Sequence, residues 1–148
     1  MTANDVDDVF AVLNLNLGEY FAPEVIQFFL AQWPDGQFVA ESLTGQVVGA
    51  LCGSKLAGNR ASVSLLAVDS SVRGMGAGTS LMASLRRACM MNGIGTIQLE
   101  VRTINENAIR FYKHLGFSVS EFLPSFYNDG GDGYRMVTAT FSSGISPS

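Results

Sequence analysis

The sequence predicts an α/β domain built on one mixed sheet, and three observations indicate this fold class. Three β-like runs, over residues 36–42, 45–55 and 60–68, follow one another through short turn-rich links, which favours antiparallel hairpins. A strand–helix–strand unit comes next, and the crossover rule makes its two strands parallel neighbours. The remaining helical segments have apolar faces and are expected to cover both faces of the sheet.

Two helices are expected before the first strand. The segment 4–17 has apolar residues at helical spacing, with Asn4 or Asp5 as its N-cap. The second helix falls within residues 22–34, where one proline suits the first turn and another ends the helix. A sheet of this kind could begin with one more strand. Here that first strand is expected to be short or absent.

The hydrophobic period changes from two to about 3.6 at Gly76, which marks the start of a third helix. Asn92 and Gly93 are its expected C-terminal stop. A buried strand, a helix with Asn105 as its cap and Gly116 at its end, and two alternating strands complete the domain. The expected ranges are 76–92, 96–101, 105–116, 117–123 and 134–141. We expect one domain over residues 1–141 and a flexible tail over 142–148.

Composition excludes several classes of function. The 148-residue chain is 47% hydrophobic and 15% charged, enough to bury a core, and its net charge of −4 argues against nucleic acid as a partner. No signal-peptide pattern is present, and no apolar run approaches the ~18 residues that suggest a membrane span. We therefore expect a cytoplasmic protein. Cys52 and Cys89 are predicted to be buried free thiols, and with His114 as the single histidine no metal site is expected.

Glycine recurs in the segment Arg73-Gly74-Met75-Gly76-Ala77-Gly78, where an apolar strand gives way to a helix. The N–H groups at a helix N-terminus have no intrahelical partner, and without side chains around them they can hold a phosphate. A structural turn is the alternative. The segment lacks the lysine of a Walker loop. It also follows antiparallel-looking strands, and Glu100, the nearest suitable acid, lies inside a strand, so it does not fit a Rossmann loop.

Two motifs at compatible spacing resemble the GNAT superfamily of acetyl-CoA-dependent N-acetyltransferases. Arg73-x-x-Gly76-x-Gly78 matches its Q/R-x-x-G-x-G/A signature, and "LEVRTINENAIRFYKHLGF" is similar to its second signature. "LGEYF" and "EFLPSFYNDGGDGYRM" resemble N-terminal protein acetyltransferases of the NatA catalytic-subunit type, while "LEVR" also matches the bacterial ribosomal-protein alanine N-acetyltransferase. The resemblance covers about Leu15 to Met136. It implies a sheet that is splayed at its parallel pair.

The resemblance implies that acetyl-CoA is the cosubstrate and that no metal is required. The diphosphate would lie on the amides of the glycine loop, with its arginine nearby, and the pantetheine arm would pair with the end of the preceding strand. The N–H of Val68 would face the thioester oxygen. Asn105 is a plain N-cap, a contact to the arm, or both. The implied residues are Leu66, Ala67, Val68, Arg73, Gly74, Met75, Gly76, Ala77, Gly78, Thr79, Asn105 and Tyr112.

Two glutamates are candidates for the base that takes the proton of the acceptor amine. Glu100 interrupts an apolar strand and matches a catalytic glutamate of the alanine N-acetyltransferase; a salt bridge to a neighbour is its alternative. Glu19, beside Tyr20, matches an active glutamate of the NatA type, and its alternative is a solvated loop residue. Tyr112 would lie beside the cofactor sulfur, unless it is a core tyrosine. Tyr127 matches a tyrosine at the peptide entrance.

The sequence therefore predicts acetyl transfer to the free α-amino group of a protein or peptide N-terminus, by direct attack in a ternary complex. Two alternatives stay open: acetylation of a small-molecule amine, and an acetyl-CoA-binding module without turnover. Gly131 and Gly133 depart from the glutamate and alanine typical of related sequences, which leaves the accepted N-termini undetermined. A homodimer or an auxiliary subunit is compatible with the resemblance.

Overall fold

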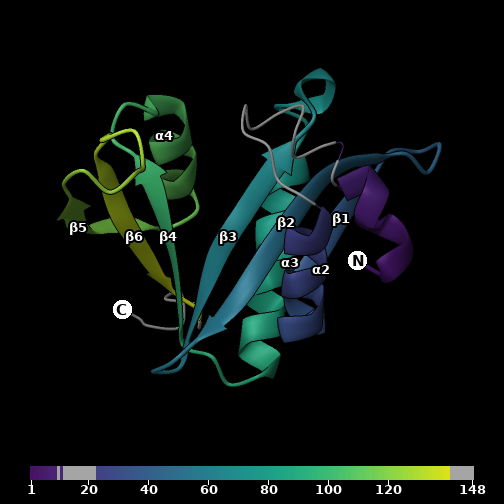
Figure 1. Cartoon of the computed structure of the whole chain (residues 1–148), viewed down its shortest axis with the longest axis horizontal. Coiled ribbons are helices and arrows are strands. Elements are labelled where there is room, and N and C mark those ends of the chain that lie inside the picture. The colour runs from purple at the N-terminus through teal and green to yellow at the C-terminus, as the bar shows by residue number, and fades with distance from the viewer. Residues whose placement is uncertain (10, 12–22, 141–148) are drawn as a thin grey trace.

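The computed structural model describes residues 1–9, 11 and 23–140. A six-stranded mixed sheet in the order β1-β2-β3-β4-β6-β5 forms its centre, and every neighbouring pair is antiparallel except β3–β4. This arrangement confirms the predicted fold class (Figure 1). The elements are η1 (Ala3–Asp5), α2 (Pro23–Gln32), η2 (Pro34–Gly36), β1 (Gln37–Glu41), β2 (Val47–Leu56), β3 (Arg60–Val68), η3 (Ser70–Val72), α3 (Ala77–Met91), β4 (Thr96–Arg102), α4 (Glu106–His114), β5 (Ser118–Leu123) and β6 (Gly133–Ala139).

The N-terminus differs from the prediction. The helical segment starts at a 3₁₀ turn whose N-cap is Thr2, ahead of the expected Asn4 or Asp5. The Thr2 amide donates to the Asp5 carboxylate at 2.8 Å, so Asp5 completes the cap from inside the turn. Residues 12–22 and the expected tail at 142–148 lie outside the described residues. Within the described part of the chain, no strand precedes β1.

Helices cover both faces of the sheet, and each face has its own core. In Figure 1 the N-terminal helical residues and α2 lie in front of the sheet, while α3 runs behind it. Val6, Val9 and Ile26 pack in front against Val47, Ala50 and Ala67. The larger core lies behind, and α3 contributes the four residues that the helical spacing predicted to be buried. They are Leu81, Met82, Leu85 and Cys89.

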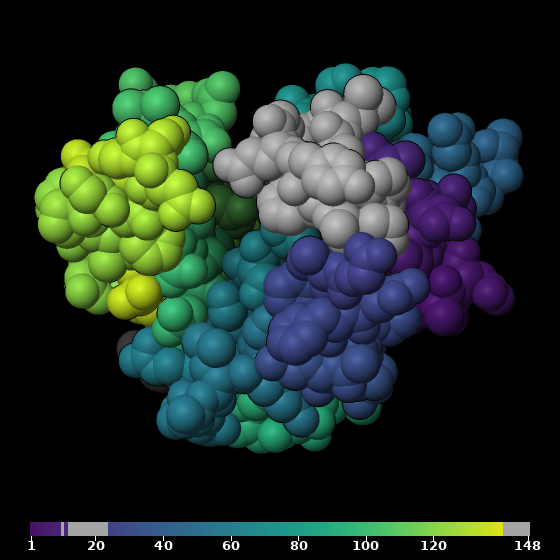
Figure 2. Space-filling model, in the orientation of Figure 1, coloured from purple at the N-terminus to yellow at the C-terminus, as the bar shows by residue number. Residues whose placement is uncertain are grey.

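The sheet opens at its parallel pair. Only three residues of β3 pair with β4, the last at Ser62↔Gln98, and the two strands diverge beyond that point. The space-filling surface is recessed beside the lobe formed by α4, β5 and β6 (Figure 2). Because β3 continues to Val68 and β4 to Arg102, the free ends of two strands border the opening.

Three general properties of the described residues bear on function. Cys52 and Cys89 are buried free thiols, as predicted, and burial raises the pKa of Cys52 to about 12. Over residues 1–9, 11 and 23–140, no group of three or more histidine, cysteine, aspartate or glutamate side chains is placed to hold a metal ion. The helices of that same part of the chain are all too short or too polar to span a membrane.

Candidate active site

The loop that joins β3 to α3 is shaped by a local turn and two glycines. Asp69, at the end of β3, accepts hydrogen bonds from the amide and hydroxyl of Ser71, both at 2.9 Å. The bond from the Ser71 amide is the main reason that the pKa of Asp69 is lowered. Gly74 and Gly76 then adopt positive φ angles of 83° and 89°, a region that other residues enter at a cost of about 1–2 kcal/mol.

Bare amides gather at the start of α3. Gly76 is the N-cap, and its carbonyl accepts the first helical bond from the Ser80 amide at 2.9 Å. Glycine has no side chain to cap the helix, so the amides of Gly76, Ala77, Gly78 and Thr79 have no partner among the described residues. These four donors and the positive end of the helix dipole suit an anion.

Two members of the predicted loop act differently from the expectation. The amide of Met75 donates to the Val72 carbonyl at 3.2 Å, so it is committed to the turn and is no free donor. Gly78 is needed for packing: a Cβ atom there would lie 3.1 Å from Cζ of Phe111 on α4. The third glycine therefore allows α3 and α4 to approach each other, while Gly74 and Gly76 supply the backbone turn.

The end of β3 presents an unpaired edge to the opening. Asp69 donates to the Val48 carbonyl at 2.7 Å, and Ala67 lies opposite Ala50 two residues earlier in the same register. Backbone groups alternate in direction along an antiparallel strand, so Ala67 pairs with β2 while Leu66 and Val68 face away from it. The β3 edge that faces β4 is thus available for an extended, amide-bearing ligand arm.

Arg73 links this edge to the loop. Its Nε donates to the Val68 carbonyl at 3.2 Å, and the side chain is exposed. The predicted cation therefore lies beside the end of β3. The Val68 N–H also faces the opening, and it stays available as a hydrogen-bond donor.

Helix α4 brings Asn105 and Tyr112 to the other side of the opening. The Asn105 side chain accepts from the Ala108 amide at 3.2 Å, so the plain N-cap role is confirmed. Tyr112 is half-buried, and its ring makes edge-to-face contacts with Phe111 and Phe117 at centroid distances of 5.3 and 5.8 Å. The hydroxyl-bearing ring is therefore held rigidly from two sides.

Burial raises the pKa of Tyr112 to about 12, with a smaller contribution from Tyr127. A free thiol titrates near 8.5, so complete proton transfer from Tyr112 to a leaving thiolate is uphill by about 5 kcal/mol. Such a tyrosine serves a developing thiolate as a hydrogen-bond donor and not as a full acid.

Glu100 lies in β4 two positions beyond Gln98, the last residue that pairs with β3. Side chains alternate along the strand. Since Leu99 belongs to the core behind the sheet, Glu100 points to the face on which α2 lies. It forms the salt bridge that sequence reasoning held as the alternative: Arg135 Nε donates to Glu100 Oε2 at 2.9 Å. Gln98 Nε2 donates to the same oxygen at 3.2 Å.

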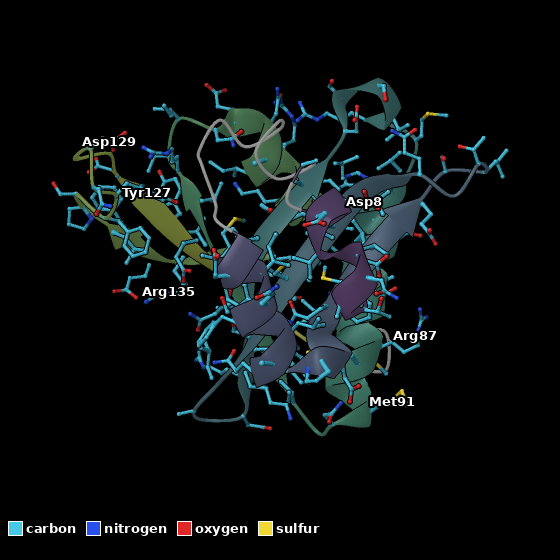
Figure 3. All side chains as sticks on the ribbon, turned by 45° about the vertical axis from the view of Figure 1, so that its right-hand side comes forward. Asp8, Arg87, Met91, Tyr127, Asp129 and Arg135 are labelled. Carbon is cyan, nitrogen blue, oxygen red and sulfur yellow. The ribbon has the colours of Figure 1, made fainter. Side chains whose placement is uncertain are left out.

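Arg102 is a site residue that sequence reasoning missed. Its Nη1 contacts both oxygens of Asp129 at 3.1 Å, and its guanidinium lies 4.1 Å from the centre of the Tyr127 ring. The Gly131 amide and then Arg102 lower the pKa of Asp129. Figure 3 shows Tyr127 and Asp129 together with Arg135 on the lobe of β5 and β6, apart from Arg87 and Met91 on α3. Side chains alternate along β4, so Arg102 lies on the same face as Glu100. This spacing could have identified Arg102 from the sequence.

The two unusual glycines make room for this cluster. A Cβ at Gly131 would lie 2.6 Å from Arg102 Nη1, and a Cβ at Gly133 would lie 3.1 Å from Cε2 of Tyr127. The departures at these positions therefore accompany close packing of Arg102 and Tyr127 at the rim of the opening.

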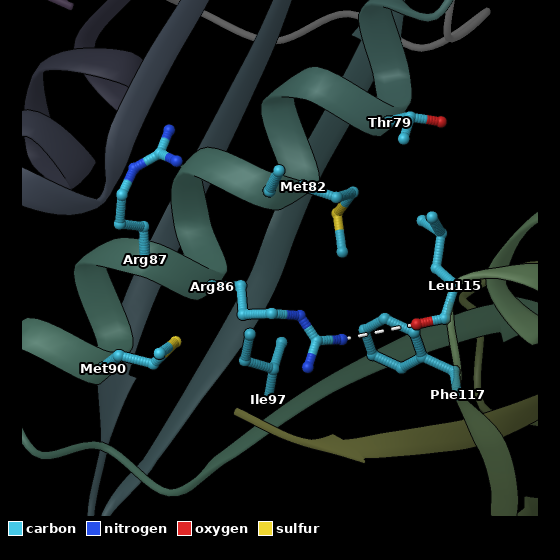
Figure 4. Close-up of a pocket in the computed structure, with 9 residues that line it drawn as sticks. Thr79, Met82, Arg86, Arg87, Met90, Ile97, Leu115 and Phe117 are labelled. Atoms are coloured by element: carbon cyan, nitrogen blue, oxygen red, sulfur yellow. Dashed lines mark hydrogen bonds between the residues drawn. The ribbon is translucent and has the colours of Figure 1, made fainter. Parts of the chain in front are cut away.

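Two pockets flank α3, and both include residues of the predicted cofactor loop. One, of about 410 Å³, lies between α3 and the junction of α4 and β5, where Arg86 Nη2 donates to the Leu115 carbonyl at 3.3 Å (Figure 4). The other, of about 750 Å³, lies between the β1–β2 hairpin and the first turns of α3 and includes Gly76 and Ala77. Neither contains Glu100 or Tyr112. The described candidate residues lie at the end of β3, at the start of α3, in β4, on α4 and in the loop before β6, whereas Glu19 and Tyr20 fall outside the described residues.

Residues 7–117 match the acetyltransferase (GNAT) family. The chain belongs to this family. It is 34% identical over 137 residues to an uncharacterized N-acetyltransferase of Methanocaldococcus jannaschii, covering 92% of this chain and 86% of that protein. It is 29% identical over 136 residues to N-alpha-acetyltransferase 30 of Schizosaccharomyces pombe, covering 88% and 89%. The chain spans only 36% of the length of the human protein of that name.

Solved structures agree with this GNAT assignment. Ard1 from Thermoplasma volcanium superposes with a TM-score of 0.89 at 34% identity, covering 96% of this chain and 95% of that one. Naa20 of Chaetomium thermophilum, in complex with a bisubstrate analogue, gives a TM-score of 0.83 at 26% identity, covering 94% and 84%. The protein is therefore an N-acetyltransferase that uses acetyl-CoA. The bare amides at the start of α3 and the unpaired β3 edge fit the diphosphate and the amide-bearing arm of this cosubstrate.

Proposed function

We propose that this GNAT enzyme acetylates the free α-amino group of a protein or peptide N-terminus. The observation that carries the proposal is the placement of Glu100 on the α2 face, where β3 and β4 part, beside the β3 edge that suits the cofactor arm. The name of one relative, N-alpha-acetyltransferase 30, supports an α-amine as acceptor.

In this reaction each residue of the site has one role. The cosubstrate supplies an activated acetyl group. An α-amine has a pKa near 7.7–8.0, so part of it is neutral at pH 7 and Glu100 needs only to accept the proton of the remainder, directly or through a water. The Val68 N–H donates to the acetyl oxygen as charge develops there, and Tyr112 donates to the departing sulfur. The reaction proceeds by direct attack, with no acetylated enzyme.

Glu19 remains a rival for the base, because it falls outside the described residues and matches the NatA-type glutamate. Matched glutamine variants separate the two. If Glu100 takes the proton, Glu100→Gln lowers kcat by about 100-fold or more, as expected for loss of a general base. Glu19→Gln then acts chiefly on the KM of the acceptor.

A panel of acceptors tests the substrate class. Peptides with free N-termini are compared with the same peptides blocked at the N-terminus, and with polyamines, aminoglycosides and free amino acids. The proposal expects turnover of free peptides that disappears on blocking. Turnover of a small amine alone would identify a small-molecule acetyltransferase, and acetyl-CoA binding without any turnover would identify a binding module.

A further inference from the structure

A row of three charged side chains crosses the half of the sheet beyond the opening. Arg135 on β6 lies directly opposite Glu100 on β4 and directly opposite Glu121 on β5. Its Nε donates to Glu100 Oε2 at 2.9 Å and its Nη1 donates to Glu121 Oε1 at 2.9 Å. One planar guanidinium thus joins two carboxylates through two different nitrogens, a geometry that a rigid fork of donors holds well.

The two carboxylate oxygens of Glu100 differ in their hydrogen bonds. The hydrogen bonds from Arg135 and Gln98 both end on Oε2. Within the described ranges, Oε1 accepts no hydrogen bond. The side chain is 21% exposed, so part of the carboxylate is open to solvent or to a ligand in the opening.

We propose that Arg135 is a positioning residue, which holds Glu100 by Oε2 and leaves Oε1 to take the proton of the acceptor amine. The inference rests on the proposed function, in which Glu100 is the base. The amine nitrogen forms a bond to the acetyl carbon, the carbon–sulfur bond breaks with its electron pair on sulfur, and the ammonium proton passes to Oε1 or to a water bound there. Arg135 exchanges no proton, because the hydrogen bond to Glu100 raises its already high pKa.

Glu121 offers a matched control. It makes the same kind of ion pair with Arg135, but it is 56% exposed and does not contact Glu100. Glu121→Gln therefore removes the ion pair between Arg135 and Glu121 and leaves the bond between Arg135 and Glu100 in place. Arg135→Met keeps much of the side-chain volume and removes the charge. Arg135→Lys keeps the charge and loses the planar set of donors that reaches both carboxylates.

The experiment measures kcat, the KM for acetyl-CoA and the melting temperature for these variants, with an acceptor that the wild type acetylates. Arg135→Met is expected to lower kcat about tenfold or more, because small misplacements of a catalytic group cost up to about 100-fold, and to leave the KM for acetyl-CoA unchanged. Arg135→Lys recovers part of the loss. Glu121→Gln stays within about twofold of wild type, since it leaves Glu100 held. In a Glu100→Gln background, Arg135→Met causes no further loss.

Two kinetic results would overturn the proposal. One is a folded Arg135→Met variant with the kcat of wild type; the other is an equal loss of kcat in the Glu100→Gln background, which would place the effect elsewhere. A crystal structure of Arg135→Met gives a readout that needs no acceptor: several orientations of the Glu100 carboxylate are expected, and one unchanged orientation contradicts the idea. A wild type that acetylates no peptide refutes the proposed function instead.

Discussion

Gly76 allows a charge to be placed at the predicted diphosphate site with almost no other change. Its φ of +89° strains most side chains, but aspartate and asparagine tolerate this region better than other residues, and a Cβ there meets no atom within 4 Å. Gly76→Asp and Gly76→Asn therefore carry similar backbone costs and differ by one negative charge. Any difference in cofactor affinity between them reports on that charge.

The expected difference follows from Coulomb's law. A carboxylate about 5 Å from one unit of phosphate charge is repelled by about 1 kcal/mol in bulk water and about 3 kcal/mol at an effective dielectric constant of 20. Since 1.4 kcal/mol is tenfold in affinity, Gly76→Asp is expected to bind coenzyme A about 5- to 140-fold more weakly than Gly76→Asn.

Isothermal titration calorimetry with coenzyme A measures this difference. The gap between the two variants is expected to narrow at about 1 M salt, where the Debye length is about 3 Å. Equal affinity of the aspartate variant, the asparagine variant and the wild type at low salt would refute the placement of the diphosphate on these amides.

Further predictions concern three other positions. Tyr112→Phe should lower kcat by about 10- to 100-fold, the value of a hydrogen bond to a developing thiolate, and leave the fold intact; steady-state kinetics and a melting curve check both, and an unchanged kcat contradicts the donor role. Burial raises the pKa of Cys52 from 9.0 to about 12, so the unfolded thiol ionises first and stability is lost as pH rises across that window, by about 1.4 kcal/mol per unit. Urea unfolding at several alkaline pH values should show a slope at least this steep, because burial also raises the pKa of Cys89 and Tyr112, and Cys52→Ala should make the slope shallower. Gly78→Val should destabilise the fold by about 1–3 kcal/mol because its Cβ crowds Phe111, whereas Thr79→Val, exposed in the same turn, should not.

The parts of the fold that depend on local chemistry could be predicted from the sequence. Asn105 is an N-cap because its side chain reaches the Ala108 amide within one turn, and Gly76 begins α3 at the residue where the hydrophobic period changes. The hairpins of β1, β2 and β3 follow from short links. The opening follows less directly: the crossover rule predicts the parallel pair, and the splay came from the family resemblance.

The contacts that complete the site depend on distant segments. Arg135 meets Glu100 only because β6 inserts between β4 and β5, which no local pattern reveals. The packing of Arg102 on Tyr127 likewise joins the end of β4 to the loop before β6. A local feature was missed at Met75. Its amide donates to the Val72 carbonyl within a four-residue turn, which the spacing of the glycines did not indicate.

A crystal structure with bound acetyl-CoA tests the whole arrangement in a single measurement. We expect the diphosphate within hydrogen-bonding distance of the Gly76–Thr79 amides, the arm along the β3 edge, and the acetyl oxygen at the Val68 N–H between Glu100 and Tyr112. A diphosphate bound anywhere else, or an acetyl group outside the opening between β3 and β4, would contradict the account.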